Sequence, residues 1–442
     1  MVVGTIIGAS IFVQPSEVSR AVPGLAWMLL VWIAAGALTW FGASICAELS
    51  SAFPRTGGVY VFLREMFSPA AGFLWGWAMF WSMHSGIIAA IAMVVARYTA
   101  AVFAVGDSGV RAIAVGAIAL LSAINYAGVR PGAGVQTGLT LTKVVAIALL
   151  LAALLGFGTL HVPAAGRAAD AGGFLRALVA GLFAFGGWHM VTYAAEETRD
   201  PQHTIPRALM IGTAVVVAVY LALNTAYMLV LPLDRVLASN TIAADAASAV
   251  GGAAAATAIS LLVVVSALGA MTGIILAGPR VYYAMAADGL LFKWMASVHP
   301  RFQTPHLAIV AQGIWASVLV LTGTYRQLFT RVVYTEWIFF GALALGVMRL
   351  RRAPTYAPAF RAWGFPVAPA LFAIVCLGIV VNQLVAEPRE SAWGLALVAA
   401  GLPVYFIWRQ RDADRRLPQP LLSAQIHRGA EVGPQQREGH DR

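Results

Sequence analysis

The stretch GTIIGASIF, residues 4–12, interrupts an apolar segment at the start of the chain. Gly4 and Gly8 are weak helix formers, and Ser10 adds a hydroxyl group. A second apolar segment, GLFAFGGWHMVTYAAEE at residues 181–197, carries Gly186 and Gly187 in its middle. The two segments lie five predicted helices apart. Glycine-interrupted helices at equivalent positions of two halves are typical of inverted-repeat transporters, so the pair predicts that architecture.

Each predicted break exposes backbone N–H and C=O groups that a continuous helix would pair internally. In lipid, an unpaired backbone group costs several kcal/mol. A polar substrate bound at the middle of the membrane would satisfy these groups. The N–H groups and the positive ends of the half-helices suit an anion such as a carboxylate. A single glycine would indicate only close helix packing, and the matching pair is what makes the pattern informative.

The composition indicates a polytopic membrane protein. The chain has 442 residues, of which 60% are hydrophobic and 11% are charged, and its mean hydropathy is +0.79. A soluble domain carries about 25% charged residues. In a membrane protein, basic residues orient loops, so the net charge of +10 does not indicate nucleic-acid binding.

Several kinds of chemistry are not expected. The chain has no phosphate-binding loop of the Walker type, which argues against a primary pump. It has no H-E-x-x-H motif and no G-x-S-x-G motif in a suitable context, so we expect no enzyme. Cys46 and Cys376 are too few for a disulfide framework or a zinc cluster. We therefore expect no cofactor and no metal.

A spanning helix needs about 20 apolar residues, and twelve segments qualify. They are 1–22, 25–47, 69–98, 111–128, 135–159, 174–194, 207–231, 253–283, 305–323, 331–350, 366–385 and 392–409. We expect a transmembrane domain over residues 1–410, with repeats at 1–159 and 174–350 and two further helices at 366–409. The polar, Pro-rich residues 411–442 are predicted to be a disordered cytoplasmic tail. The loop distribution of basic residues places both termini in the cytoplasm, so we expect a multi-pass protein of the inner (cytoplasmic) membrane.

Several segments also resemble a known family. They are GTIIGASIFVQP, AELSSAFPRTGGVYVFLREMF, GVRPGAGVQTGLTLTKVVAIALL, GLFAFGGWHMVTYAAEETRDPQHTIPRAL and ADGLLFKW. These segments look like the amino acid–polyamine–organocation superfamily, and most like its L-type amino acid transporter branch and bacterial relatives. The resemblance implies an all-α fold of LeuT type, with a five-plus-five inverted repeat. Helices 1 and 6 would be broken, and helices 11 and 12 would lie outside the repeat.

The resemblance further implies an amino acid held between the two breaks. The substrate carboxylate would meet the backbone at Ile7, Gly8, Ala9, Ser10 and Ile11, and the amino group would meet carbonyls near Phe183, Ala184 and Gly186. Phe183 falls where the family keeps an aromatic gate above the substrate. Trp188 is a further candidate to shape the pocket.

The chain also departs from the family pattern. Relatives often have Gly-Ser-Gly where this chain has Gly8-Ala9-Ser10, and the L-type branch often has Asn at the position of His189. Both differences leave the identity of the substrate open. Relatives usually carry a longer N-terminal segment, so Met1 is a candidate for a misassigned start.

Lysine and histidine inside predicted helices have both a functional and a plain interpretation. In sodium-independent members of the family, a lysine at the position of Lys143 replaces a sodium ion and bridges helices 1, 5 and 8. Alternatively, Lys143 snorkels to the inner surface. His189 could carry a coupled proton, recognise a substrate side chain, or be a neutral packing residue. Packing is the favoured interpretation for His84.

Three glutamates lie near predicted helix ends. The family pairs acids like Glu48 and Glu196 with basic loop residues to hold the inward gate shut, and Arg55 and Arg199 are the candidates here. Plain interfacial placement is the alternative. Glu336 is expected near the outer end of helix 10, at the interface.

The predicted function is secondary active transport of amino acids by alternating access, either proton-coupled or by exchange. Lys143 argues against sodium coupling. Helices 1 and 6 carry no acid at mid-depth, which favours neutral amino acids. The alternatives are a polyamine or cationic amino acid carrier and a non-transporting amino acid sensor. Apart from its substrate and the lipid bilayer, we expect no obligate partner, since neither cysteine lies in a predicted outside loop.

Overall fold

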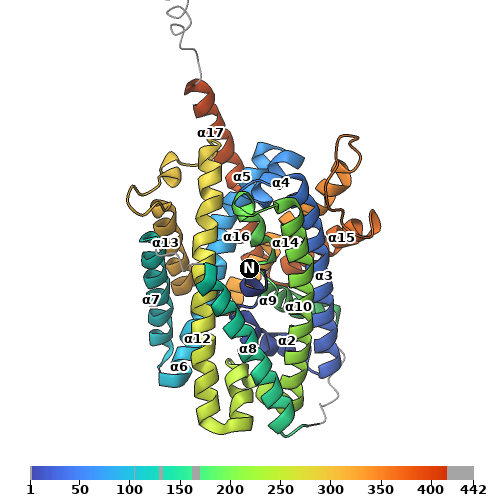
Figure 1. Ribbon diagram of the computed structural model, residues 1–442, viewed down its shortest axis with the longest axis vertical. Coiled ribbons are helices and arrows are strands. Elements are labelled where there is room, and N and C mark those ends of the chain that lie inside the picture. The colour runs from blue at the N-terminus through green and yellow to red at the C-terminus, as the bar shows by residue number, and fades with distance from the viewer. Residues whose placement is uncertain (1, 104, 129–132, 162–169, 416–442) are drawn as a thin grey trace, which may run out of the picture.

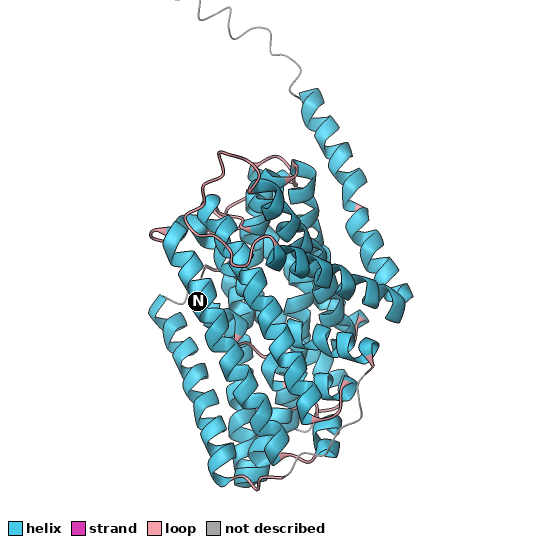
Figure 2. Ribbon diagram, turned by 90° about the vertical axis from the view of Figure 1, so that its right-hand side faces the viewer, coloured by secondary structure: helices cyan, strands magenta, loops and turns pink. Residues whose placement is uncertain are grey.

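The apolar runs form long helices because a helix pairs its own backbone groups where lipid offers no partner. The computed structural model describes residues 2–103, 105–128, 133–161 and 170–415. This described part contains helices and loops and no strand, as Figure 2 shows. The all-α prediction is thereby confirmed for these residues.

Within the described ranges, nine helical stretches are long and apolar enough to cross a membrane. They comprise α3 (Leu25–Ala52), α5 to α6 (Pro69–Phe103), α7 (Asp107–Tyr126), part of α8 (Ala133–Phe157), α9 to η3 (Ala171–Glu197), α10 (Pro201–Val230), α12 (Ile242–Ala287), α14 (Tyr325–Leu350) and α15 (Val367–Ala386). Two shorter apolar stretches are α13 (His306–Thr322) and the Gly394–Trp408 region of α16 (Pro388–Ala399) and α17 (Gly401–Arg415). The predicted count of twelve spans remains a prediction.

The predicted first span is split. It consists of α1 (Val2–Ile6), the 3-10 helix η1 (Ser10–Phe12) and α2 (Gln14–Ala21). The predicted sixth span is likewise split into α9 (Ala171–Ala184) and η3 (Trp188–Glu197). Both predicted breaks are therefore present in the structure.

Several predicted helix boundaries differ from the structure. The largest difference is at α12, which was predicted at 253–283 but begins at Ile242, with the non-helical residues Gly251 and Gly252 inside it. The helix predicted at 331–350 begins earlier, because Thr324 and Gln327 form a capping box before Tyr325. Residues 411–415 of the predicted tail continue α17, which ends at Arg415, and residues 416–442 lie outside the described part.

The remaining described helices are short. They are the 3-10 helix η4 (Lys293–Ala296) and the α-helices α4 (Val59–Met66) and α11 (Leu233–Ala238), while η2 (Met79–Met83) is a π-helical turn between α5 (Pro69–Ala78) and α6 (His84–Phe103). Helix α4 follows the predicted PRTGG loop and packs against α5.

Helix packing brings the two breaks together at the centre of the bundle. Helices α3 and α10 pack along each other on one side of the molecule, while α6, α7, α12 and α13 form a second group on the opposite side (Figure 1). Helix α1 contacts α10 and η3, and α2 contacts α9. The halves of the two broken helices are thus mutual neighbours. Helix α17 projects from the bundle (Figure 2).

Candidate functional site

The first break leaves backbone donors without internal partners. The Ile7 amide still donates to the Val3 carbonyl at 2.8 Å, and the Gly8 amide turns back to the Ile6 carbonyl at 2.7 Å. In the described chain, the next three amides, those of Ala9, Ser10 and Ile11, donate to no backbone carbonyl. Three successive donors at the start of a half-helix can bind an anionic group.

The second break leaves a backbone acceptor. Gly187 has a φ of +95°, a left-handed conformation that favours glycine. The Phe183 carbonyl accepts from the Gly186 amide at 3.0 Å, and the Ala184 carbonyl accepts from the Tyr220 hydroxyl at 3.1 Å. Of the three carbonyls expected to meet a substrate amino group, only that of Gly186 has no hydrogen-bond donor among the described residues.

A single hydroxyl group links the two breaks. The Tyr220 hydroxyl lies 3.0 Å from the Ile6 carbonyl and 3.1 Å from the Ala184 carbonyl. A Cβ atom placed on Gly187 would lie 3.3 Å from the Thr5 carbonyl oxygen. The two backbones therefore approach closely, and glycine at 187 leaves room for that approach.

A small cavity lies between the breaks, with a volume of about 20 Å³. Its lining comprises Thr5, Ile6, Gly8, Ser10, Ile87, Ile91, Phe183, Gly186, Gly187, Met190, Ile274, Val332 and Glu336. A cavity that holds one water molecule needs about 10–15 Å³. The structure is therefore closed around this space, and a bound amino acid requires it to expand.

The cavity brings together four residues of the predicted site and excludes others. Gly8, Ser10, Phe183 and Gly186 line it. The other predicted binding residues are Ile7, Ala9, Ile11, Ala184, Trp188 and His189, which are buried and do not line it. The Trp188 ring packs 4.9 Å from the Phe340 ring, between centroids. Trp188 and His189 thus lie behind the cavity, whereas Met190 from the same turn faces it.

The position of Glu336 in the structure differs from the predicted one. Glu336 was expected at the interface, but it is 4% exposed and lines the cavity. Its Oε1 atom lies 4.0 Å from Nε2 of His189. An acid within a membrane helix marks a functional candidate by default. That signal was present in the sequence.

On the side of the cavity that faces α2, aromatic rings and a buried acid close the space. The Phe183 ring lies 5.5 Å from Phe329 and 6.5 Å from Tyr325, between centroids. On the same side, Glu17 accepts from Arg20 at 2.6 Å and from Arg326 at 2.7 Å. Because Glu17 lies on α2, this ion pair ties the second half of the first broken helix to α14.

The ion pairs predicted for the inward gate are replaced by others in the structure. Glu48 binds Arg351, at 2.5 Å, and not Arg55. Glu196 is exposed, and its neighbour Glu197 pairs with Arg280 at 3.1 Å. The partners were missed because acid and base lie far apart in the chain. Glu197 lies on η3, so this pair ties the second half of the second broken helix to α12.

A third contact joins the loop helix α4 to the end of α12. Asp288 accepts from Arg64 and from the Tyr60 hydroxyl, the latter at 2.5 Å. Burial and the hydrogen bond to Asp288 raise the pKa of Tyr60 above its usual range. A Cβ atom placed on Gly58 would lie 2.2 Å from Thr192 Oγ1, which shows how closely this loop packs on η3.

Lys143 lies on α8, close to the first broken helix. A Cβ atom placed on Gly4 would lie 2.5 Å from Thr140 Oγ1, so α8 touches α1 one turn before Lys143. Lys143 is 8% exposed, which does not fit a side chain that snorkels into water. Among the described residues, it forms no ion pair or hydrogen bond that would show the predicted bridge between helices 1, 5 and 8.

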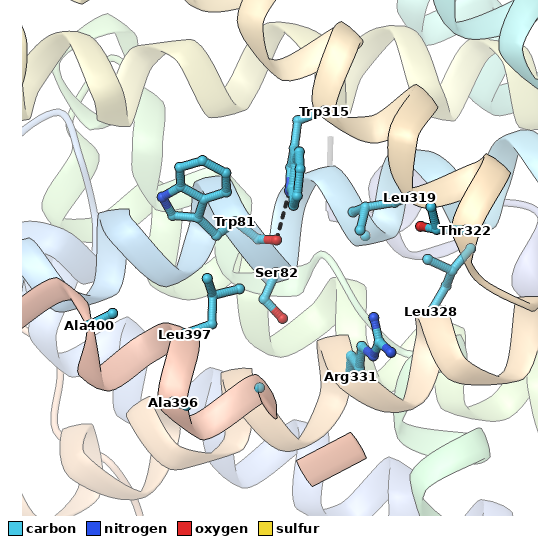
Figure 3. Close-up of a pocket in the computed structure, with 12 residues that line it drawn as sticks. Trp81, Ser82, Trp315, Leu319, Thr322, Leu328, Arg331, Ala396, Leu397 and Ala400 are labelled. Atoms are coloured by element: carbon cyan, nitrogen blue, oxygen red, sulfur yellow. Dashed lines mark hydrogen bonds between the residues drawn. The ribbon is translucent and has the colours of Figure 1, made fainter. Parts of the chain in front are cut away.

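A larger cavity of about 490 Å³ lies elsewhere, between η2, α13, α14 and α16 (Figure 3). Trp81 and Trp315 are neighbours in its lining, and the Trp315 indole N–H donates a 2.8 Å hydrogen bond to the Trp81 carbonyl. It contains none of the predicted binding residues and neither break. Size alone therefore does not identify the candidate site.

Comparison with known proteins identifies the family of this chain. The amino acid permease family model matches residues 1–407. The chain is 29% identical over 419 residues to the serine/threonine exchanger SteT of Bacillus subtilis, covering 94% of this chain and 96% of that protein. It is 29% identical to the human b(0,+)-type amino acid transporter 1, covering 92% and 86%. It is 30% identical to the large neutral amino acids transporter small subunit 2 of Rattus norvegicus, covering 92% and 78%. The chain is therefore a multi-pass membrane transporter, not an enzyme, and belongs to the amino acid permease family of the amino acid–polyamine–organocation superfamily.

Proposed function

We propose that the protein carries neutral amino acids across the cytoplasmic membrane by alternating access, without sodium. The observation that carries this proposal is the pairing of donors and acceptor across one cavity. The unpaired amides of Ala9, Ser10 and Ile11 suit a carboxylate, and the Gly186 carbonyl suits an ammonium group. This arrangement matches the two charged groups that every amino acid shares.

In this mechanism, the site opens on either side when contacts between a broken helix and its neighbours are released. Release of the Glu17–Arg326 pair and of the Phe183 ring would open the outer side. Release of the Glu197–Arg280 pair would open the inner side, where Glu48 would act through Arg351. The observed closure on both sides supports an occluded intermediate, as alternating access requires.

We also propose that Lys143 takes the place of a sodium ion and that the carrier needs no disulfide-linked partner. Burial of Lys143 beside the first broken helix supports its role as a substitute for a sodium ion. Cys46 and Cys376 are both buried, in α3 and α15, which supports a carrier without a disulfide-linked partner. Both termini are proposed to be cytoplasmic.

Glu336 favours a second candidate function, a carrier of cationic amino acids or polyamines. Its carboxyl group lines the cavity, where it could bind a positively charged side chain. This acid comes from α14, outside the helices whose lack of acids favoured neutral substrates.

A ligand screen tests both candidates. Purified protein in detergent is heated with each of the twenty amino acids, agmatine or putrescine, with and without sodium, at pH 5.5 and 7.5. Stabilisation by neutral amino acids, independent of sodium, is expected. Stabilisation only by arginine, lysine, agmatine or putrescine would favour the second candidate. A strict sodium requirement would contradict the role of Lys143, and no stabilisation by any compound would contradict both functions.

A further inference from the structure

Behind the candidate site lies a group of buried polar side chains without hydrogen-bond partners in the described structure. It comprises His84, His189, Tyr193 and Glu336, which we call the polar cluster. Both ring nitrogens of each histidine, the Tyr193 hydroxyl and Oε1 of Glu336 are unpaired. Buried polar atoms are rarely left without a partner, so a cluster of them requires an explanation.

The polar cluster is continuous with the cavity through Glu336. This carboxyl group lines the cavity, and its Oε1 atom lies 4.0 Å from Nε2 of His189. The His189 ring lies 5.6 Å from Tyr193, and Tyr193 lies 6.0 Å from His84, between centroids. Glu336 is thus the point at which water in an opened cavity would reach the cluster.

The surroundings of Glu336 and His189 disfavour an unpaired charge on either side chain. The rings of Trp75, Trp188 and Phe340 lie within 5.8 Å of the His189 ring, between centroids. The titratable group that acts on His189 is His84 from α6. Tyr193, on the same element as His189, is near Glu336 and also near Cys46 from α3 and Tyr282 from α12. The basic side chain found beside Glu336 is His189, with Nε2 4.0 Å from Oε1.

A buried unpaired charge is costly, so the closed site favours a pair with no net charge. Two arrangements meet this condition. The proton lies on Glu336 and both groups are neutral, or it lies on His189 and the two form an ion pair. Both arrangements hold one proton more than a carboxylate beside a neutral imidazole. Closure of the site therefore favours a pair that has bound one proton.

We propose that Glu336 and His189 form a proton-binding site that couples amino acid transport to the proton gradient. The inference rests on the proposed carrier function and adds its coupling ion. With the cavity open to the outside, one proton from water binds the Glu336 carboxylate. It stays on the pair during closure and leaves to water on the inner side. A zwitterionic amino acid carries no net charge, so each cycle moves one positive charge inwards.

Proteoliposomes test the proposal. They contain the pH dye pyranine and receive L-alanine, L-serine, L-threonine, L-leucine and L-phenylalanine outside. The wild type is expected to acidify the lumen, and an inside-negative potential is expected to accelerate that acidification. Counterflow of radiolabelled L-serine, L-leucine and L-phenylalanine, measured on vesicles preloaded with the same amino acids, reports carrier function separately.

Two substitutions distinguish proton coupling from other roles. Glu336→Gln is expected to lose acidification, while counterflow continues at an altered rate that no longer depends on pH. Glu336→Asp keeps a carboxyl group and is expected to restore acidification. Asp200→Asn is the matched control, because Asp200 also pairs with a histidine, His203, at 3.0 Å but is exposed. This control is expected to acidify like the wild type.

The possible results distinguish a failure of proton coupling from a failure of the proposed carrier function. Counterflow without acidification or voltage dependence in the wild type would overturn proton coupling and leave the carrier function standing. Acidification by Glu336→Gln at the wild-type rate would overturn the assignment of the site. Loss of counterflow and of ligand stabilisation in a folded Glu336→Gln protein would make Glu336 a substrate ligand instead. No counterflow in the wild type, together with no stabilisation in the ligand screen, would contradict the proposed function itself.

Discussion

The two helix breaks differ in the backbone conformation of their glycines. At the first break, Gly8 does not adopt a positive φ, and the chain turns through a short backbone contact to Ile6. At the second, Gly187 has a φ of +95°. Gly8 therefore leaves space beside the cavity, whereas Gly187 provides a conformation that other residues rarely adopt. Glycines that look alike in the sequence serve two distinct physical needs.

The halves that follow the breaks also differ in how they close the site. Helix α2 carries Glu17, which is buried and pairs with two arginines. The segment η3 carries Glu197, which is exposed and pairs with Arg280. The contact at α2 therefore holds its acid more strongly than the contact at η3.

The largest expected effect tests the role of space at the first break. Gly8→Leu would fill a cavity of about 20 Å³, so ligand-induced stabilisation is expected to disappear while the protein still folds. Gly116→Leu is the matched control, because no heavy atom lies within 4 Å of a Cβ atom placed there. Thermal shifts measured with the amino acids found in the screen check this prediction. Full ligand stabilisation of Gly8→Leu would place the binding site elsewhere.

Conformation at the second break is tested by comparing two alanine substitutions. Gly187→Ala is expected to cost about 1–3 kcal/mol, because it forces a side-chain-bearing residue into a strained backbone region. Gly8→Ala is expected to be nearly neutral, since the new Cβ atom would lie 3.6 Å from the Ala270 Cβ, an ordinary contact. Thermal unfolding in detergent without ligand compares the two. Equal stabilities would remove the distinction between the breaks.

The two closures are tested by removing one charge from each. Glu17→Gln is expected to lower stability by about 1.5–3 kcal/mol, the range for hydrogen bonds to charged groups. Glu197→Gln is expected to cost about 0–1 kcal/mol, as for surface ion pairs. Added salt should reduce the second effect and leave the first, because buried pairs are screened less. A larger loss at Glu197 than at Glu17 would reverse the assignment.

A further prediction concerns the hydroxyl group that links the two breaks. Tyr220→Phe removes the contacts to the Ile6 and Ala184 carbonyls and is expected to cost about 1 kcal/mol. Tyr227→Phe is the control, because its hydroxyl is buried on the same helix without a partner in the described structure. Melting temperatures with and without ligand compare the two variants. No difference between them would show that the link is not needed.

Much of the architecture follows from local sequence features. Long apolar runs become helices wherever lipid forbids unpaired backbone groups, and α15 begins and ends within one residue of its predicted boundaries. By contrast, α3 ends five residues later and α10 begins six residues earlier than predicted. Gly186 and Gly187 mark a break that the structure contains. The start of α14 was missed by six residues because a capping box depends on two side chains rather than on hydropathy.

The candidate site was predicted less completely, and its errors concern side-chain direction. Within one turn after the break, Trp188 and His189 face the protein interior while Met190 faces the cavity. Hydropathy does not distinguish them, because η3 is buried on nearly all sides. Glu336 was predicted at the interface because its helix was predicted to begin at residue 331. Since α14 begins at Tyr325, Glu336 lies further from the start of its helix than predicted.

The sequence by itself determined the class of protein, the positions of the two breaks and the chemistry of an exposed backbone. These properties depend on composition and on neighbouring residues, which a single chain reveals directly. Only the tertiary structure decided which partners meet. Glu48 pairs with Arg351, 303 residues away, and Glu336 meets His189 across two helices. Such pairings depend on how the helices pack, and no local rule of helix formation specifies them.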